Sequence, residues 1–190
     1  MRLRETGASR SMTTDRELVV REASASDVRR IAQLHIASWQ VTYTSELPSD
    51  FLAKQDPVAH AAGWLRQLEE GVHVQVVEEN GSLVGFVACG PGRDGPSLRE
   101  EEWEIYNLHV ARSRQGQGIG SAMYEKAVRM GRGHGARTLI LWVVRTNARA
   151  RAFYEWKGMR HDGGEQEHSV GLGHVLHEVR YRMRLSGSEV

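Results

Sequence analysis

The sequence predicts a single α/β domain in which a central mixed, mostly antiparallel sheet is flanked by helices. Three observations predict it. The 190 residues contain no internal repeat and no long Pro- or Gly-rich linker, so one domain is the simplest organisation. An Asn80-Gly81 dipeptide between two β-rich runs indicates an antiparallel hairpin. A β-α-β-α order in the second half requires at least one parallel crossover in the same sheet.

The domain boundaries follow from composition. Residues 1–17 are polar and aperiodic, and 186–190 are small and polar, so we expect a flexible N-terminal tail and a C-terminal tail around a domain spanning 18–185. Leu18–Glu22 alternates weakly and predicts a first strand. Ser24 and Asp27 have the spacing of a capping box, followed by apolar residues at helical spacing. Asp56-Pro57 is a suitable start for a second helix.

The middle of the chain is predicted to form strands. His73–Val77 and Leu83–Cys89 form the predicted hairpin. The glycines and proline of Gly90–Gly95 predict a loop, and Trp103–Val110 predicts the next strand.

The last third returns to alternating elements. A helix is expected from Ile119 until the glycines at 131, 133 and 135, and the apolar run Thr138–Val144 indicates a strand covered on both faces. Asn147 can cap a short helix that Gly158 ends. Val175–Leu185 alternates as a final strand, and as a sheet edge it could pair with a second copy in a homodimer.

Composition excludes several classes of protein. With 25 Lys+Arg against 24 Asp+Glu, the chain lacks the charge of a dedicated nucleic-acid binder. Its apolar runs are far shorter than the roughly 18 residues that span a bilayer, so no membrane association is expected. Cys89 is the single cysteine, which excludes an internal disulfide, makes a buried structural role the default, and favours a reducing, cytoplasmic location. The histidines near the end, His168, His174 and His177, show no metal-site spacing, and no metal is expected.

The most informative stretch runs from Leu108 to Gly120, where a strand ends, a Gly-rich turn follows and a helix begins. Free N–H groups and the positive dipole end at a helix start favour a phosphate or pyrophosphate. A P-loop would need Lys-Ser/Thr after its last glycine, but Ser121-Ala122 follows Gly120. A dinucleotide fingerprint would need glycine where Ser121 stands. Neither motif fits.

The pattern Gln115-Gly116-Gln117-Gly118-Ile119-Gly120 resembles the Q/R-x-x-G-x-G/A pyrophosphate loop of the GNAT superfamily of acyl-CoA-dependent N-acetyltransferases. The sequence also resembles the next motif of this family, which is a strand, an Asn, a Tyr and a Gly-aromatic pair. The matching residues are the strand Leu139–Val144, then Asn147, Phe153-Tyr154, and Gly158-Met159 with Met where the family usually has Phe. The resemblance covers about residues 18–185 and is most specific from 103 to 159.

The resemblance implies acetyl-CoA as acyl donor and assigns the residues that hold it. The backbone of Leu108, His109 and Val110 should bond the pantetheine arm, with an N–H near Val110 polarising the thioester oxygen. Asn147 should hold the arm from the other side, with Ala150 packing nearby. The backbone amides of the loop should cradle the pyrophosphate; they belong to Gln115, Gly116, Gln117, Gly118, Ile119, Gly120 and Ser121. The arginines 145, 149 and 151 could meet the 3′-phosphate or simply face solvent.

Two residues are candidates for proton transfer. By resemblance, Tyr154 is the general acid that protonates the departing thiolate; the alternative is a tyrosine that only packs on the cofactor. Glu104 is the first candidate for the base, because strand alternation places it on the same face as Val110, six residues on. Glu102 on that face is the second candidate, and a water chain is the alternative to both.

Trp39 and Tyr43 lie in a segment that borders the acceptor site in similar bacterial proteins, and they are the expected substrate contacts, although core packing is an equal alternative for Trp39. The predicted function is acetyl transfer from acetyl-CoA to a primary amine of a small molecule by direct attack. Acetylation of a protein or peptide amine, and a non-catalytic acyl-CoA-binding sensor module, are the alternatives.

Overall fold

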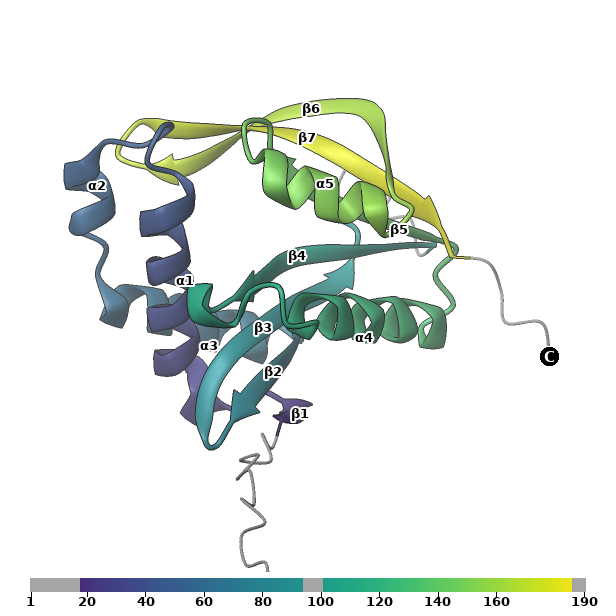
Figure 1. Cartoon of the computed structure of the whole chain (residues 1–190), viewed down its shortest axis with the longest axis horizontal. Helices are drawn as coiled ribbons and strands as arrows, with labels where there is room; N and C mark the ends of the chain where they lie inside the picture. Colours follow the sequence, from purple (N-terminus) through teal and green to yellow (C-terminus); the bar gives the residue numbers. More distant parts are fainter. Residues whose placement is uncertain (1–17, 94–100, 186–190) are drawn as a thin grey trace, which may run out of the picture.

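Seven strands form one sheet in the order β1-β2-β3-β4-β5-β7-β6 (Figure 1). The computed structural model describes residues 18–93 and 101–185. The expected tails, and the part of the expected loop beyond residue 93, lie outside the described residues. All strand pairs are antiparallel except β4 with β5, which confirms the mixed, mostly antiparallel sheet with one crossover. The strands are β1 (Leu18–Glu22), β2 (His73–Glu79), β3 (Ser82–Pro91), β4 (Glu102–Val110), β5 (Thr138–Val144), β6 (Arg160–Gly171) and β7 (His174–Arg184).

Helices cover both faces of the sheet. On one face, α4 and α5 pack over β3, β4, β5 and β7, and Figure 1 shows β4 running between these two helices. On the other face, α1 and α3 pack over β2 and β3. The short α2 packs against the end of β5 and against β7. The helices are α1 (Val28–Thr42), α2 (Ser49–Ala53), α3 (Pro57–Glu69), α4 (Ile119–Gly133) and α5 (Ala148–Trp156), with 3₁₀ turns at Ala25–Asp27 (η1) and Arg112–Arg114 (η2).

The predicted caps explain where the helices start. The Asp56 side chain accepts a hydrogen bond of 2.9 Å from the Val58 N–H, and Pro57 is the first helical residue of α3. At the other cap, Asp27 accepts from the Ser24 N–H at 2.9 Å and is fully buried. Because Arg21 donates to both Asp27 oxygens, at 2.7 and 2.8 Å, the buried charge is paired. This ion pair lowers the pKa of Asp27 well below its ordinary value.

Several sequence expectations require correction. The β3 strand continues through Gly90 to Pro91, so the first part of the expected loop is strand. Helix α4, by contrast, ends at Gly133, among the glycines expected to end it; a Cβ at 131 would lie 2.8 Å from Trp103 Cγ, so this glycine lets the helix approach the sheet. The expected edge strand at 175–185 is interior, because β7 lies between β5 and β6. Neither β6 nor α2 was predicted.

No helix in residues 18–93 and 101–185 has the length and apolarity needed to span a membrane.

Candidate active site

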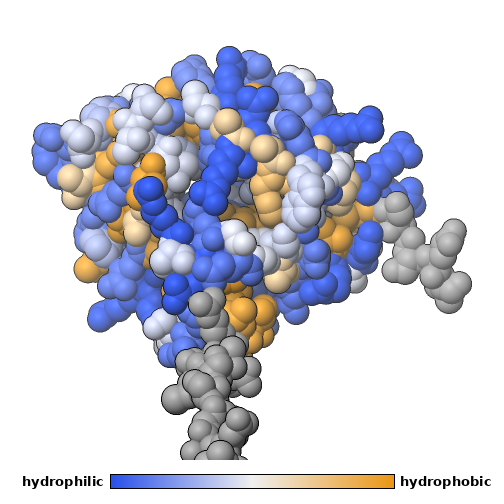
Figure 2. All heavy atoms as spheres, viewed as in Figure 1, coloured by the Kyte–Doolittle hydropathy of each residue, from blue (hydrophilic) through white to orange (hydrophobic). Residues whose placement is uncertain are grey.

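The site begins where β4 and β5 separate. Their parallel pairing starts at Glu102 with Thr138 and stops at Ile105 with Leu141, although the strands continue to residues 110 and 144. Beyond that point, the facing edges have no ladder between them, so their backbone N–H and C=O groups are available to a ligand. A cleft of about 1300 Å³ opens there. Figure 2 shows the hollow near the centre of this face, with apolar side chains inside a largely polar rim.

A bulge in β4 sets which side chains enter the cleft. Ala88 pairs with Asn107 while the next residue, Cys89, pairs with Ile105, so Tyr106 is an extra residue. The bulge reverses the alternation along the strand: Leu108 and Val110 pack into the same core cluster as Ile105. The premise that Glu104 and Val110 share a face, six residues apart, is therefore wrong.

The Gly-rich loop has the backbone that its sequence predicts. Gly116 and Gly118 have φ of 77° and 84°, in the left-handed region that favours glycine, and Gly118 is the N-cap of α4. The Gln115 side-chain amide donates to the Val110 carbonyl at 3.1 Å, which ties the loop to the end of β4. At the third glycine, Gly120, a Cβ would come within 3.6 Å of Val110 Cγ2. The free N–H groups of the first turn of α4 thus open onto the cleft.

Helix α5 supplies the opposite wall. Its N-cap is Asn147, whose Oδ1 accepts from the Ala150 N–H at 3.1 Å, so the side-chain NH₂ group is left for a ligand. Tyr154, on the same helix, lines the cleft and is 8% exposed. Burial, with smaller contributions from Tyr43 and Tyr124, raises the pKa of the Tyr154 hydroxyl well above its ordinary value. The hydroxyl is therefore protonated at neutral pH.

The two glutamates expected as bases have different positions. Glu104 lines the cleft, and its carboxylate accepts from Arg93: Nη2 to Oε1 at 2.8 Å and the backbone N–H to Oε2 at 2.9 Å. The Glu102 side chain does not line the cleft and accepts from Arg182 at 2.5 Å. Of the two, the geometry favours Glu104.

The end of the cleft where the acceptor is expected contains aromatic side chains and lies near carboxylates. Trp39 and Tyr43 line it, with ring centroids 5.6 Å apart in an edge-to-face arrangement, and both also pack against the cluster formed by α2. Burial, followed by the nearby carboxylates of Glu178 and Glu46, raises the pKa of the Tyr43 hydroxyl well above its ordinary value. The Tyr43 hydroxyl is therefore uncharged at neutral pH.

The structure brings nearly all the predicted site residues to this one cleft. Gln117 and Ile119 are the exceptions: their side chains do not line it, and Ile119 is buried in the core. Of the three arginines considered for the 3′-phosphate, only Arg149 lines the cleft. Arg145 instead pairs with Glu165 at 2.6 Å, and Arg151 donates to the Tyr181 hydroxyl at 3.1 Å.

Other residues of the cleft were not found from the sequence. Asn107 and Tyr106 are placed by the bulge, for which the sequence carries no recognised signal. Glu178 faces the cleft from β7, and Trp142, within the apolar run 138–144 that indicated a strand covered on both faces, is half-buried and lines the cleft. His35 from α1 also reaches the cleft wall.

Comparisons with known proteins agree with this geometry. The model of the Acetyltransferase (GNAT) family matches residues 28–159. The uncharacterized N-acetyltransferase YuaI of Bacillus subtilis (strain 168) is 32% identical over 130 residues, which cover 68% of this chain and 73% of YuaI. An N-acetyltransferase structure from Staphylococcus aureus Mu50 superposes with a TM-score of 0.70 at 20% identity, covering 89% of this chain and 99% of that one. The candidate acetyltransferase yncA from Salmonella typhimurium, a structure with its cofactor acetyl-CoA, has a TM-score of 0.67 at 20% identity, covering 92% and 97%. The chain therefore belongs to the GNAT family of acetyl-CoA-dependent N-acetyltransferases.

Proposed function

We propose that this enzyme transfers the acetyl group of acetyl-CoA to the primary amine of a small molecule, by direct attack of the amine on the thioester. The observation that carries the proposal is the separation of β4 from β5 beside the Gly-rich loop, with Tyr154 on the facing wall. These features offer a pyrophosphate site, a free strand edge and a proton donor along one cleft. Acetyl-CoA supplies the activated acyl group.

The chain's own groups fit the donor along its length. The first-turn amides of α4 and the left-handed Gly116 and Gly118 suit a pyrophosphate. The free β4 edge from residue 106 to Val110 can bond the amides of a pantetheine arm as an added strand would. From the other wall, the Asn147 NH₂ group can bond the same arm, and Arg149, one of the arginines that line the cleft, can bind the 3′-phosphate.

Rate enhancement then comes mainly from positioning. A donor fixed along the β4 edge presents its thioester to an amine held at the aromatic end of the cleft. In our proposal, Tyr154 donates its proton to the departing sulfur as the C–S bond breaks. Glu104 takes the proton of the attacking amine through a water bound at Oε1, since this oxygen accepts one bond, from Arg93 Nη2, and keeps a second lone pair, whereas Oε2 accepts from both the backbone N–H and Nε of Arg93.

The walls of the acceptor end favour a small amine over a peptide. Trp39 and Tyr43 line this part of the cleft, Tyr106 and Trp142 line the same cleft, and flat aromatic walls suit a compact ligand. The carboxylate of Glu178, which lies near Tyr43, attracts a cationic amine to this end.

Two measurements on one sample test the proposal. Calorimetry gives the affinity for acetyl-CoA, and thiol release is then followed with a panel of small primary amines and of peptides with free N-termini or lysines. We expect binding, and turnover with small amines. Turnover of peptides alone would replace the small-molecule acceptor by a protein. Binding without any turnover would favour the non-catalytic sensor, and absence of binding would overturn the whole assignment.

A further inference from the structure

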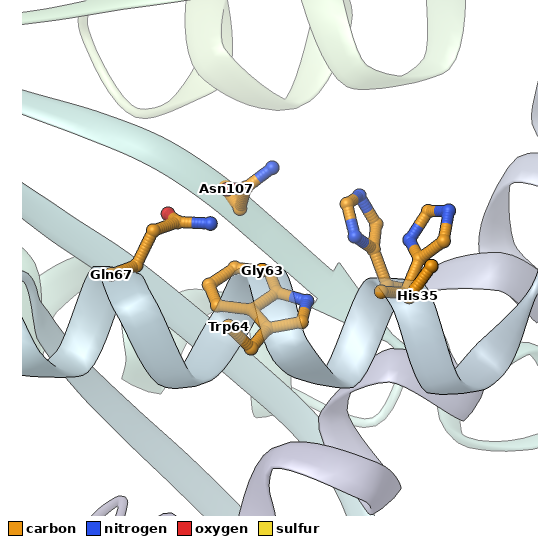
Figure 3. A pocket seen from close by; sticks show the side chains of 7 residues that line it. His35, Gly63, Trp64, Gln67 and Asn107 are labelled. Atoms are coloured by element: carbon orange, nitrogen blue, oxygen red, sulfur yellow. The ribbon is translucent and has the colours of Figure 1, made fainter.

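A second, smaller pocket opens beside the acceptor end of the cleft. It has a volume of about 310 Å³ and lies between α1, α3 and β4. Three of its residues, His35, Gln67 and Asn107, also line the main cleft, so the two spaces adjoin each other. Figure 3 shows these three side chains pointing to the same space above Trp64. We call this space the side pocket; its lining residues are His35, Ala59, His60, Gly63, Trp64, Gln67 and Asn107.

His35 is the unusual residue of the side pocket. Its side chain is 9% exposed, and within the described residues neither ring nitrogen has a hydrogen-bond partner. It is instead surrounded by rings, with His109 at 4.8 Å, Trp39 at 5.3 Å and Trp64 at 5.6 Å between centroids. Burying an unpaired polar group is unfavourable. An imidazole in this position therefore indicates a ligand that supplies the partner.

Two further polar groups of the side pocket are also available, whereas His60 Nε2 is already hydrogen-bonded to Gln55 Oε1 at 2.8 Å. In the part of the chain that the structure describes, the side-chain amides of Gln67 and Asn107 make no hydrogen bond. Each can donate and accept, as a neutral imidazole can. Burial lowers the pKa of both His35 and His60, so these rings are uncharged at neutral pH. The histidines do not make a metal site, because the described residues contain no cluster of ligands that could hold one.

The side pocket and the cleft thus differ in charge. The cleft is lined by charged side chains of both signs; Glu104 is paired with Arg93, and Glu178, near Tyr43, is a carboxylate that suits an ammonium group. The side pocket is lined by no Asp, Glu, Lys or Arg among the described residues. Its volume equals that of roughly ten water molecules at about 30 Å³ each, which is enough for a small ring with one hydroxyl.

We propose that the side pocket binds the uncharged, hydroxyl-bearing part of the acceptor, while its amine lies in the cleft. The acceptor is then a hydroxylated amine, and polyamines or amino acids, whose second group is charged, are poor acceptors. This inference rests on the proposed function, because it names the acceptor class of the same site. A phenol and a sugar both offer the required hydroxyl, and the experiment below separates them.

The test compares matched acceptors and matched variants. The acceptors are tyramine and its hydroxyl-free analogue phenethylamine, glucosamine as the sugar, and spermidine as the charged amine. Gly63→Leu fills the side pocket: a Cβ at this position of α3 meets only Arg66 Nη2, at 3.9 Å, and leucine is a better helix former than glycine. Ala62→Leu, exposed on the same helix and outside the lining, is the control. His35→Phe keeps a ring but removes both nitrogens.

We expect kcat/KM at least tenfold higher for tyramine or glucosamine than for phenethylamine and spermidine. Gly63→Leu should lower kcat/KM for the preferred acceptor at least tenfold, mainly through KM, with the affinity for acetyl-CoA unchanged. His35→Phe should abolish the preference for the hydroxyl, and Ala62→Leu should behave as wild type. The proposal would be overturned if the best acceptor carried a second charged group, as spermidine does, or if Gly63→Leu had wild-type kinetics.

A binding measurement separates this inference from the proposed function. Tyramine and glucosamine are titrated by calorimetry into the protein saturated with coenzyme A. Binding to wild type that is lost in Gly63→Leu supports the side pocket even if no amine is acetylated. Failure of both compounds to bind wild type would refute the side pocket, whatever the enzyme acetylates.

Discussion

Replacing Gly118 by valine should show how the conformation of the Gly-rich loop affects the affinity for acetyl-CoA, apart from any effect on the stability of the fold. Gly118 has φ of 84°, and a Cβ built there has no heavy atom within 4 Å. The Cβ of a valine therefore meets no steric obstacle in the free protein, and we attribute the expected effect to the backbone conformation. Holding a non-glycine residue in the left-handed region costs about 1–2 kcal/mol, and more when it is β-branched.

The free chain can avoid this strain by moving the loop out of the left-handed conformation, which turns the loop amides away from the pyrophosphate. Ligand binding must then restore the conformation. A strain of about 1–2 kcal/mol reduces the population of the competent loop roughly 5- to 30-fold, and the apparent affinity for acetyl-CoA falls by the same factor. Calorimetric titration of acetyl-CoA measures that factor directly.

Gly81→Val is the matched control. Gly81 also has a positive φ, 77°, and open space around its Cβ, but it lies in the β2–β3 turn, outside the lining of the cleft. Gly81→Val should lose stability in urea unfolding at an unchanged affinity, while Gly118→Val should lose affinity. An affinity within twofold of wild type for Gly118→Val, or an equal loss in Gly81→Val, would refute the reasoning.

Three further predictions follow from single side chains. Tyr154→Phe should reduce kcat by about 100-fold or more while leaving the affinity for acetyl-CoA within twofold, in steady-state kinetics and calorimetry; unchanged kcat would exclude the acid role. Burial lowers the pKa of His109 to about 4. In the unfolded chain the pKa of a histidine is about 6.5. Between about pH 4 and pH 6.5 the unfolded chain therefore binds more protons than the folded chain, so the free energy of unfolding rises with pH in this range. His109→Gln should remove about 2 kcal/mol of the difference in unfolding free energy between about pH 5 and pH 7.5, and an identical pH dependence would contradict it. Gly131→Ala should cost about 1–3 kcal/mol in thermal or urea unfolding, because its Cβ would lie 2.8 Å from Trp103 Cγ, whereas Gly133→Ala, with nothing within 4 Å, should not destabilise the protein.

Local signals in the sequence were sufficient for much of the fold. Asp56-Pro57 and Asn147 each placed a helix start, and the Asn80-Gly81 turn placed a hairpin, because caps and turns depend on a few neighbouring residues. The strand β6 was not found, since Arg160–Gly171 is mostly polar and exposed at the sheet edge and has no apolar alternation. Its partner β7 supplies the apolar side chains instead.

The site could be predicted where one motif forms it and not where distant segments meet. The loop from Gln115 to Ser121 is continuous, so its sequence was enough. The face of β4 on which Glu104 lies relative to Val110 depends on the bulge at Tyr106. One extra residue creates this bulge, and no recognised sequence pattern marks it. The side pocket joins His35, Gly63 and Asn107 from three elements, and no spacing in the sequence relates them.

The short pairing of β4 with β5 also affects how the domain holds together. Residues 102–105 and 138–141 provide the ladder between the β1–β4 half of the sheet and the β5–β7 half, whereas neighbouring strands within each half pair over most of their length. Local opening should therefore begin at this seam, and amide hydrogen exchange should be fastest along its unpaired edges. A ligand that bonds the free edge of β4 and the start of α5 joins the two halves and protects those amides in proportion to its concentration and affinity. In our proposal, this short ladder and the place of reaction coincide, so we expect donor binding and resistance to local unfolding to increase together.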